Sequence, residues 1–93
     1  MTALDSFNEL KRLNTIVKEM ALKGEDVSEQ KGILFAAAQN LALQMINELS
    51  EGYPEQIRID AYEELFKCKT MKEVKAQLKS LVFARDLLNH IKD

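Results

Sequence analysis

The sequence predicts an all-α protein: a small antiparallel four-helix bundle made by one domain. Apolar residues recur every three or four positions along most of the 93-residue chain, which is the helical period. Short segments, two of which contain glycine, separate four such stretches, and no alternating pattern indicates a strand. Connections this short favour antiparallel neighbours. We therefore expect helices over residues 5–23, 27–51, 54–68 and 71–91 of a single domain, residues 1–93.

The first expected helix, residues 5–23, has an ambiguous start. Ser6 with Glu9 and Thr2 with Asp5 both have the spacing of a capping box. Gly24 follows the last turn and is a typical stop signal. The apolar residues of this segment share one face, which we expect to be buried: Leu4, Phe7, Leu10, Leu13, Val17 and Met20.

The second expected helix, residues 27–51, contains a charge-free run in a sequence that is 30% charged. The run covers 16 residues, from Gly32 to Asn47, which is too short for a bilayer span of about 20 residues. We expect it to form the central and most buried helix. Asp26 with Glu29 is a further capping box, and Gly52 ends the segment. Its broad apolar side consists of Leu34, Ala38, Leu41, Ala42, Met45, Ile46 and Leu49.

Local start signals define the remaining two helices. Pro54 suits the first turn of a helix over residues 54–68, whose apolar side is Ile57, Ala61, Tyr62, Leu65 and Phe66. Thr70 with Glu73 gives the clearest capping box, at the start of residues 71–91. That last segment carries a seam with 3-4-3-4 spacing, formed by Met71, Val74, Leu78, Leu81, Arg85 and Leu88.

The composition excludes several classes of protein. A single cysteine, Cys68, excludes a disulfide framework and a multi-cysteine zinc site. The three glycines are scattered, so no phosphate-binding loop is present. The N-terminal residues lack the pattern of a secretory signal, and no segment is long enough to span a membrane, so we expect a cytoplasmic protein. A net charge of -2 gives no global attraction to nucleic acid or anionic lipid.

The sequence contains no recognisable catalytic or metal-binding motif. A Cys–His pair would need Cys68 beside His90, and nothing in the surrounding residues marks either one. We interpret Cys68 as a buried thiol and His90 as a favourable cation in the last helical turn. No glutamate lies three residues before the only histidine, so the motif of a di-iron bundle is lacking. We expect no enzyme activity, no metal and no cofactor.

The weaker side of residues 27–51 is a candidate surface for a protein partner. It combines amides and apolar groups without ions, and the cores of interfaces are depleted in charge. Cover by another helix of the same bundle, or a neutral solvent face, are the alternatives. The residues of this surface, here called the amide face, are Ile33, Ala36, Gln39, Asn40, Leu43, Gln44 and Asn47.

Phe83 and Arg85 break the pattern of the last helix. Phe83 points away from the seam, on the side of Lys72, where it either anchors a partner or is covered by a loop. Arg85 lies on the seam, and a buried arginine must be paired. We favour an ion pair with Glu48, Glu64 or Glu9 over a role at an interface with a partner.

Charge is divided unevenly between two halves of the C-terminal region. Residues 48–66 carry a net charge of -5, and residues 67–93 carry +4. Lys72, Lys75 and Lys79 form a stripe on one face of the last helix. The stripe either contacts an anionic partner, including nucleic acid, or is a solvated face attracted to the acidic third helix. We favour the second interpretation.

These observations favour a small non-enzymatic regulatory protein that binds another protein, as an adaptor, inhibitor, immunity or antitoxin-like regulator. Homodimerisation through the second or fourth helix is a further expectation. The alternative is a nucleic-acid-associated regulator that uses the lysine stripe. Bacteriocin immunity proteins are small helical bundles of similar length, but no diagnostic residues align with them, so this is an analogy of fold only.

Overall fold

The computed structural model describes the backbone of residues 3–92 and the side chains of residues 3–87. It contains four helices: α1 (Ala3–Leu22), α2 (Ser28–Leu49), α3 (Glu55–Phe66) and α4 (Met71–Lys92). Residues 3–92 hold no strand, so the expected all-α class is confirmed. None of these helices is both long enough and apolar enough to cross a membrane.

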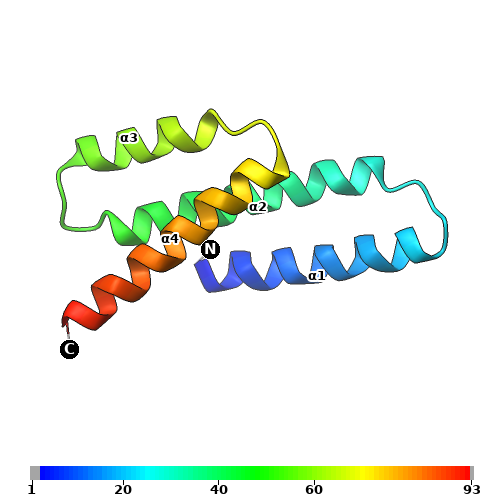
Figure 1. Cartoon of the computed structure of the whole chain (residues 1–93), viewed down its shortest axis with the longest axis horizontal. Coiled ribbons are helices and arrows are strands. Elements are labelled where there is room, and N and C mark those ends of the chain that lie inside the picture. The colour runs from blue at the N-terminus through cyan, green and yellow to red at the C-terminus, as the bar shows by residue number, and fades with distance from the viewer. Residues whose placement is uncertain (1–2, 93) are drawn as a thin grey trace.

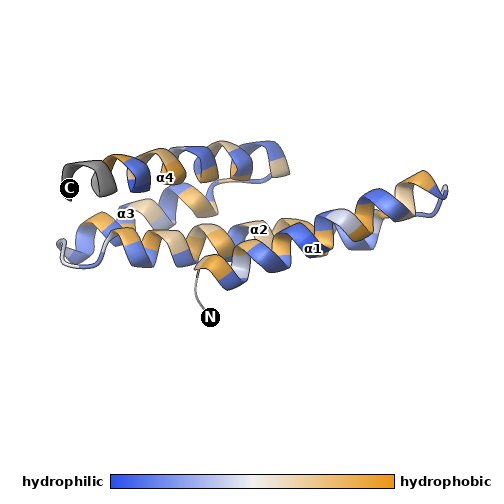
Figure 2. Cartoon of the chain, turned by 90° about the horizontal axis from the view of Figure 1, so that it is seen from below, coloured by the Kyte–Doolittle hydropathy of each residue, from blue (hydrophilic) through white to orange (hydrophobic). Residues whose placement is uncertain are grey.

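The central helix is α2, which packs against each of the other three. α1, α2 and α3 lie side by side, each antiparallel to the next, and α4 crosses this layer obliquely (Figure 1). Turned by 90°, the same arrangement shows α4 on one face of the layer (Figure 2). The fold therefore differs from the expected bundle of four aligned helices in the position of α4. Ala38 and Ala42 on α2, both almost fully buried, allow α4 to pack closely where the two helices cross.

Three clusters of buried side chains lie along α2 and form the core. Leu41 and Met45 join Ala3 of α1 in the first cluster. Ala38 joins Cys68 and Val74 in the second, and Leu65 of α3 packs against Ala42 and Ile46 in the third. The charge-free run thus supplies the most buried helix, as expected. Leu78 of α4 packs against all three clusters and ties them together.

Both glycine stop signals and one capping box are confirmed. Gly24 and Gly52 have φ values of 78° and 85°, a conformation that glycine adopts without strain. At the start of α4, Thr70 Oγ1 accepts the Glu73 N–H at 3.2 Å. The Glu73 carboxylate in turn accepts the Thr70 hydroxyl and the Lys69 N–H, at 3.0 and 3.3 Å. The first of these bonds satisfies a backbone N–H that the helix itself leaves without a partner.

Three of the other expected helix starts are wrong in detail. α1 already begins at Ala3, so Ser6 lies inside the helix, buried, and accepts a hydrogen bond from Asn40 Nδ2 at 3.5 Å. The alternative cap of this helix, Thr2 with Asp5, includes a residue that lies outside the described residues. Asp26 accepts the Ser28 N–H at 3.0 Å instead of forming a box with Glu29. The Ser28 hydroxyl, which also donates to Asp26, and then the Ser28 N–H lower the pKa of Asp26. Pro54 is the residue before α3 rather than part of its first turn.

Some residues expected in the core lie open to solvent. Leu4 and Phe7 on α1 are 67% and 46% exposed, and Ile57 and Phe66 on α3 are 50% and 59% exposed. The reason is the oblique path of α4, which covers the middle of α2 and leaves the first turns of α1 and much of α3 uncovered (Figure 1). The uncovered turns of α1 border an apolar hollow.

Candidate functional site

α1 and α4 form the two walls of an apolar trough whose floor is α2. The trough comprises a cavity of about 550 Å³ and a smaller one of about 170 Å³. Leu10 of α1 and Leu78 of α4 line both cavities, so the two lie next to each other along α2. We call this feature the α1–α4 trough.

The floor of the trough is one continuous face of α2. Its residues are spaced 4-3-4-3 along the chain, which places them in one row on a helix: Leu34, Ala38, Leu41, Met45 and Glu48. At 1.5 Å per residue, this row is about 21 Å long. The opposing wall on α4 has the same spacing and extent, from Met71 through Lys75, Leu78 and Val82 to Arg85.

Apolar side chains remain accessible along the edges of the larger cavity. Leu4, Phe7 and Val82 are 67%, 46% and 38% exposed and converge on it from α1 and α4. In a chain that is 30% charged, a hollow apolar surface of this kind is typical of a site for a protein or ligand. Sequence analysis missed these residues because their helical spacing also fits a buried core, and no local signal distinguishes the two.

The charged groups of the trough are mostly basic. Lys11 lies over the Phe7 ring, with its Nζ 5.6 Å from the ring centre, and Lys75 faces it across the smaller cavity. Glu48, the one acid lining either cavity, accepts the Ala3 N–H at 3.1 Å. Arg85 lines the larger cavity, at the opposite end of the trough from Lys75. Three bases and one acid therefore line the trough.

The expected burial and pairing of Arg85 are wrong. Its side chain is 49% exposed, and its ion pair is with the adjacent Asp86, at 3.7 Å, rather than with Glu48, Glu64 or Glu9. Glu9 pairs with Arg12 and Glu64 pairs with Lys67. The physical reason is that the later turns of α4 run past the layer formed by the other helices, so this part of the seam meets solvent (Figure 1).

Some residues of the amide face contact neighbouring helices, and others are exposed to solvent. Asn40 donates to Ser6 on α1, and Asn47 accepts a hydrogen bond from the Tyr62 hydroxyl of α3. Leu43 packs against the third core cluster. Gln39 and Gln44 are half-buried, whereas Ile33 and Ala36 are exposed. Neighbouring helices therefore use part of this face, and none of its residues lines the trough.

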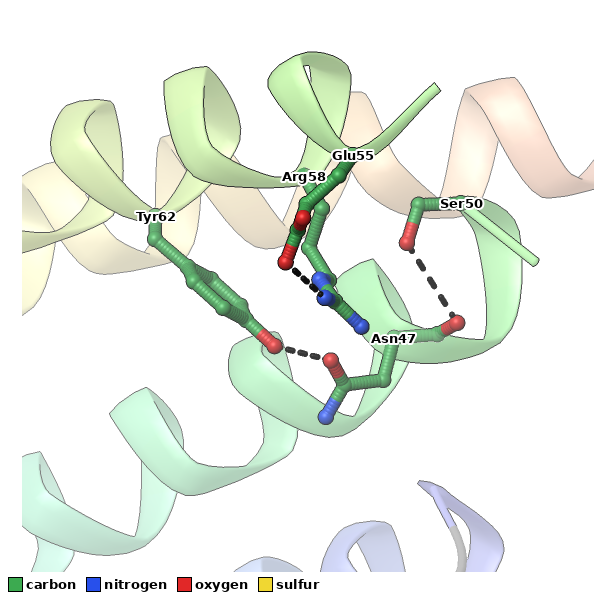
Figure 3. A network of polar contacts seen from close by, with 5 residues as sticks. All are labelled: Asn47, Ser50, Glu55, Arg58 and Tyr62. Atoms are coloured by element: carbon green, nitrogen blue, oxygen red, sulfur yellow. Dashed lines mark hydrogen bonds and ion pairs between the residues drawn. The ribbon is translucent and has the colours of Figure 1, made fainter. Parts of the chain in front are cut away.

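A polar network joins the end of α2 to α3 (Figure 3). Tyr62 donates its hydroxyl to Asn47, and the Ser50 hydroxyl donates to the Asn47 carbonyl at 3.4 Å. Beside them, Arg58 pairs with Glu55 at 2.9 Å. The Tyr62–Asn47 bond holds α2 against α3, whereas the other two contacts lie within one helix or its end, so we assign the network a structural role.

Phe83 on α4 is 70% exposed, and the residues of the lysine stripe on the same helix are exposed as well. No loop within the described residues covers Phe83. Lys72, Lys75 and Lys79 are exposed, and none of them forms an ion pair with α3 among residues 3–87. The expected attraction to the acidic helix therefore produces no direct contact. Of the residues predicted to bind partners, the trough contains only Lys75 and Arg85.

The two members of the Cys–His pair considered from the sequence lie at opposite ends of α4, and the side chain of His90 is outside the described residues. Cys68 precedes α4 and His90 lies in its last turn, so the helix separates them by roughly 28 Å. Cys68 is buried, its Sγ lies 3.6 Å from the Glu64 carbonyl oxygen, and burial raises the pKa of its thiol. Within the described part of the chain, no three His, Cys, Asp or Glu residues are grouped to hold a metal ion.

Comparison with known protein families, with curated protein sequences and with solved structures finds no significant match to this chain.

Proposed function

We propose that this chain is a small non-enzymatic regulatory protein that acts by binding another protein through the α1–α4 trough. The observation that supports this proposal is the trough itself: an apolar hollow with walls from two helices, a floor from a third, and accessible Leu4, Phe7 and Val82 at its edges. Covering such a surface is favourable by roughly 25 cal/mol for each Å² of apolar area removed from water.

The kind of regulator and its compartment are proposed from the amino-acid sequence. An adaptor, inhibitor, immunity or antitoxin-like regulator needs a recognition surface and no catalytic group. The cytoplasm is the compartment that we propose for it. A second copy of the chain is the main competitor for the site, because homodimers also cover apolar surfaces.

A photo-cross-linking experiment tests the proposal. A photoreactive phenylalanine analogue is placed at Val82, on the edge of the trough, and at Leu22, which is 89% exposed at the far end of α1. We expect one cross-linked protein at position 82 that is not found at position 22. Adding Phe7→Glu should remove it. The same products at both positions, or products insensitive to Phe7→Glu, would contradict the proposal.

A nucleic-acid-associated regulator is the second candidate, favoured by one observation. Lys72, Lys75 and Lys79 are exposed on one side of α4 and form no ion pair among the described residues. Binding through such a stripe should weaken steeply with salt, because cations are released from the nucleic acid. Replacing the three lysines with glutamine should then abolish binding to DNA and RNA. Binding unaffected by these changes would exclude the stripe.

A further inference from the structure

We propose that copies of this chain associate with one another through two exposed stripes of side chains, with α3 of one copy packed on α4 of the next. The α3 stripe consists of Ile59, Glu63 and Phe66. The α4 stripe consists of Ala76, Lys79 and Phe83. None of these residues lines the α1–α4 trough, so the contact leaves the trough accessible to a different protein. The inference therefore goes beyond the proposed function and does not depend on it.

Helical spacing places the members of each stripe on one side of their helix. The α3 stripe has 4-3 spacing and the α4 stripe has 3-4 spacing, both of which follow the helical period. All six side chains are exposed, whereas other sides of the same helices supply the buried Leu65 and Val74. The two stripes therefore do not cover each other within one chain.

The two spacings match when the helices run antiparallel, because 4-3 in one direction is 3-4 in the other. With Glu63 opposite Lys79, Ile59 lies opposite Phe83, each about 6 Å along its helix from the charged residue. The other two members, a phenylalanine and an alanine, lie opposite each other about 4.5 Å in the other direction. Every member of one stripe thus has a partner on the other.

Charge complementarity identifies the partner as a second copy. Residues 48–66 carry a net charge of -5 and residues 67–93 carry +4, so the chain holds two regions of opposite sign. Glu63 and Lys79 form no ion pair among residues 3–87, whereas other acids of α3 pair with bases near them in sequence. Packing α3 on α3, or α4 on α4, brings like charges together, which disfavours both arrangements. Packing α3 on α4 of another copy pairs the two free charges.

The apolar members make this pairing favourable beyond its charges. Ile59 and Phe66 are 40% and 59% exposed, and Phe83 is 70% exposed. An exposed ion pair alone contributes little to affinity. Burying these three side chains removes apolar surface from water, which is the main favourable term in association.

The size of the contact sets its strength and symmetry. α3 has 12 residues and is about 18 Å long, so one helix on one helix falls in the class of small interfaces, below about 1,200 Å². The two stripes are different surfaces, so the contact is heterologous and either closes into a ring or continues from copy to copy. We therefore expect weak, reversible association that increases with protein concentration and decreases with salt.

Sedimentation equilibrium of the full chain, up to millimolar concentration, tests the inference. The average mass should rise with concentration, and Phe83→Ser should weaken this association at least tenfold. Glu63→Lys and Lys79→Glu should each weaken it at least fivefold, because each places like charges opposite one another. The two charge reversals combined in one chain should restore association to within about twofold of the original, because the attraction returns with its signs exchanged.

Two variants on α1 are matched controls. Glu19→Lys and Lys18→Glu change the net charge by the same amounts at exposed positions outside both stripes, and both should associate as the original chain does. Circular dichroism confirms that each variant is folded.

Three results would overturn the inference. The chain could be a monomer at every concentration, the combined reversal could fail to restore association, or the controls on α1 could weaken it equally. Association that is lost in Val82→Glu and unchanged in Phe83→Ser would place the second copy at the trough and reject the two stripes.

Discussion

Thr70 shows how much a single residue contributes to where a helix begins. Its hydroxyl accepts the Glu73 N–H and donates to the Glu73 carboxylate, which also accepts the Lys69 N–H. These three residues are close in sequence, so their bonds depend on local geometry and need no tertiary contact. This is why the start of α4 could be predicted from the spacing of Thr70 and Glu73.

Thr70→Ala should lower the free energy of unfolding by about 1 kcal/mol, the usual cost of losing a capping side chain. Urea denaturation followed by circular dichroism measures the change. Thr15→Ala is the control, because Thr15 lies inside α1 and its hydroxyl bonds only to the carbonyl of Lys11 in the same helix. That control should change stability by less than about 0.5 kcal/mol. Equal losses in both variants would contradict the role of the cap.

Arg85 is a residue whose surroundings the sequence did not reveal. Its place on the seam of α4 predicted a buried and paired guanidinium, whereas its side chain is 49% exposed beside Asp86. Helical spacing specifies which residues share a face, but it does not specify how far along the helix a neighbour covers that face. The exposure of Arg85 was therefore beyond prediction from residue patterns.

At the scale of elements, two glycines differ in their position relative to α2: one lies inside the helix and the other follows its end. Gly32 lies within α2, and a Cβ added there would meet no atom within 4 Å. Gly52 follows α2 with a φ of 85°, which disfavours any side chain. Replacing glycine with alanine at these two positions should therefore change the free energy of unfolding in opposite directions.

Gly32→Ala should raise the free energy of unfolding by up to about 1 kcal/mol, because alanine favours the helix and has room there. Gly52→Ala should lower it by about 1 kcal/mol, because alanine is strained at that backbone conformation. Thermal and urea unfolding of the two variants show whether each change in the free energy of unfolding is positive or negative. Stabilisation by Gly52→Ala, or destabilisation by Gly32→Ala, would disprove this assignment of the glycines.

The helices themselves were predictable to within about two residues at most ends, because period, caps and stop signals are local. The faces that they bury were less predictable. The apolar side of α2 is buried as expected, whereas Phe66 on α3 and Phe7 on α1 are exposed. α3 is short and carries only Leu65 as a buried residue, so its neighbours could not be inferred from its own pattern.

At the scale of the whole molecule, Leu78 connects the parts of the core. It packs against the clusters formed with α1, with Cys68 and with α3. It also lines both cavities of the trough. The stability of the fold and the shape of the proposed site therefore depend on the same side chain.

Leu78→Ala should lower the free energy of unfolding by about 2–3 kcal/mol, near the low end for leucine truncation because the side chain is half-buried. Leu87→Ala on the same helix, where the leucine is 51% exposed, should change it by less than about 0.5 kcal/mol. Urea denaturation distinguishes the two. A loss in Leu78→Ala no larger than that in Leu87→Ala would show that the clusters are stabilised independently of this residue.

The α1–α4 trough exists only at this scale. Its lining comes from three helices, and residues such as Leu10, Met45 and Leu78 read in the sequence as ordinary core positions. Lys75 and Arg85 were singled out from the sequence, but for separate reasons and with no indication that they share one hollow. Their juxtaposition depends on the path of α4 across α2 (Figure 1).

The sequence by itself determined the all-α class, the number of helices, most of their ends and the central place of α2. Each of these follows from the spacing of nearby residues or from the lack of charge along one segment. Only the tertiary structure decided the oblique crossing of α4, the exposure of Leu4, Phe7 and Arg85, and the trough between α1 and α4. These depend on contacts between residues distant in sequence, such as the packing of Leu78 on α4 against the clusters that contain Ala38 and Ala42 of α2.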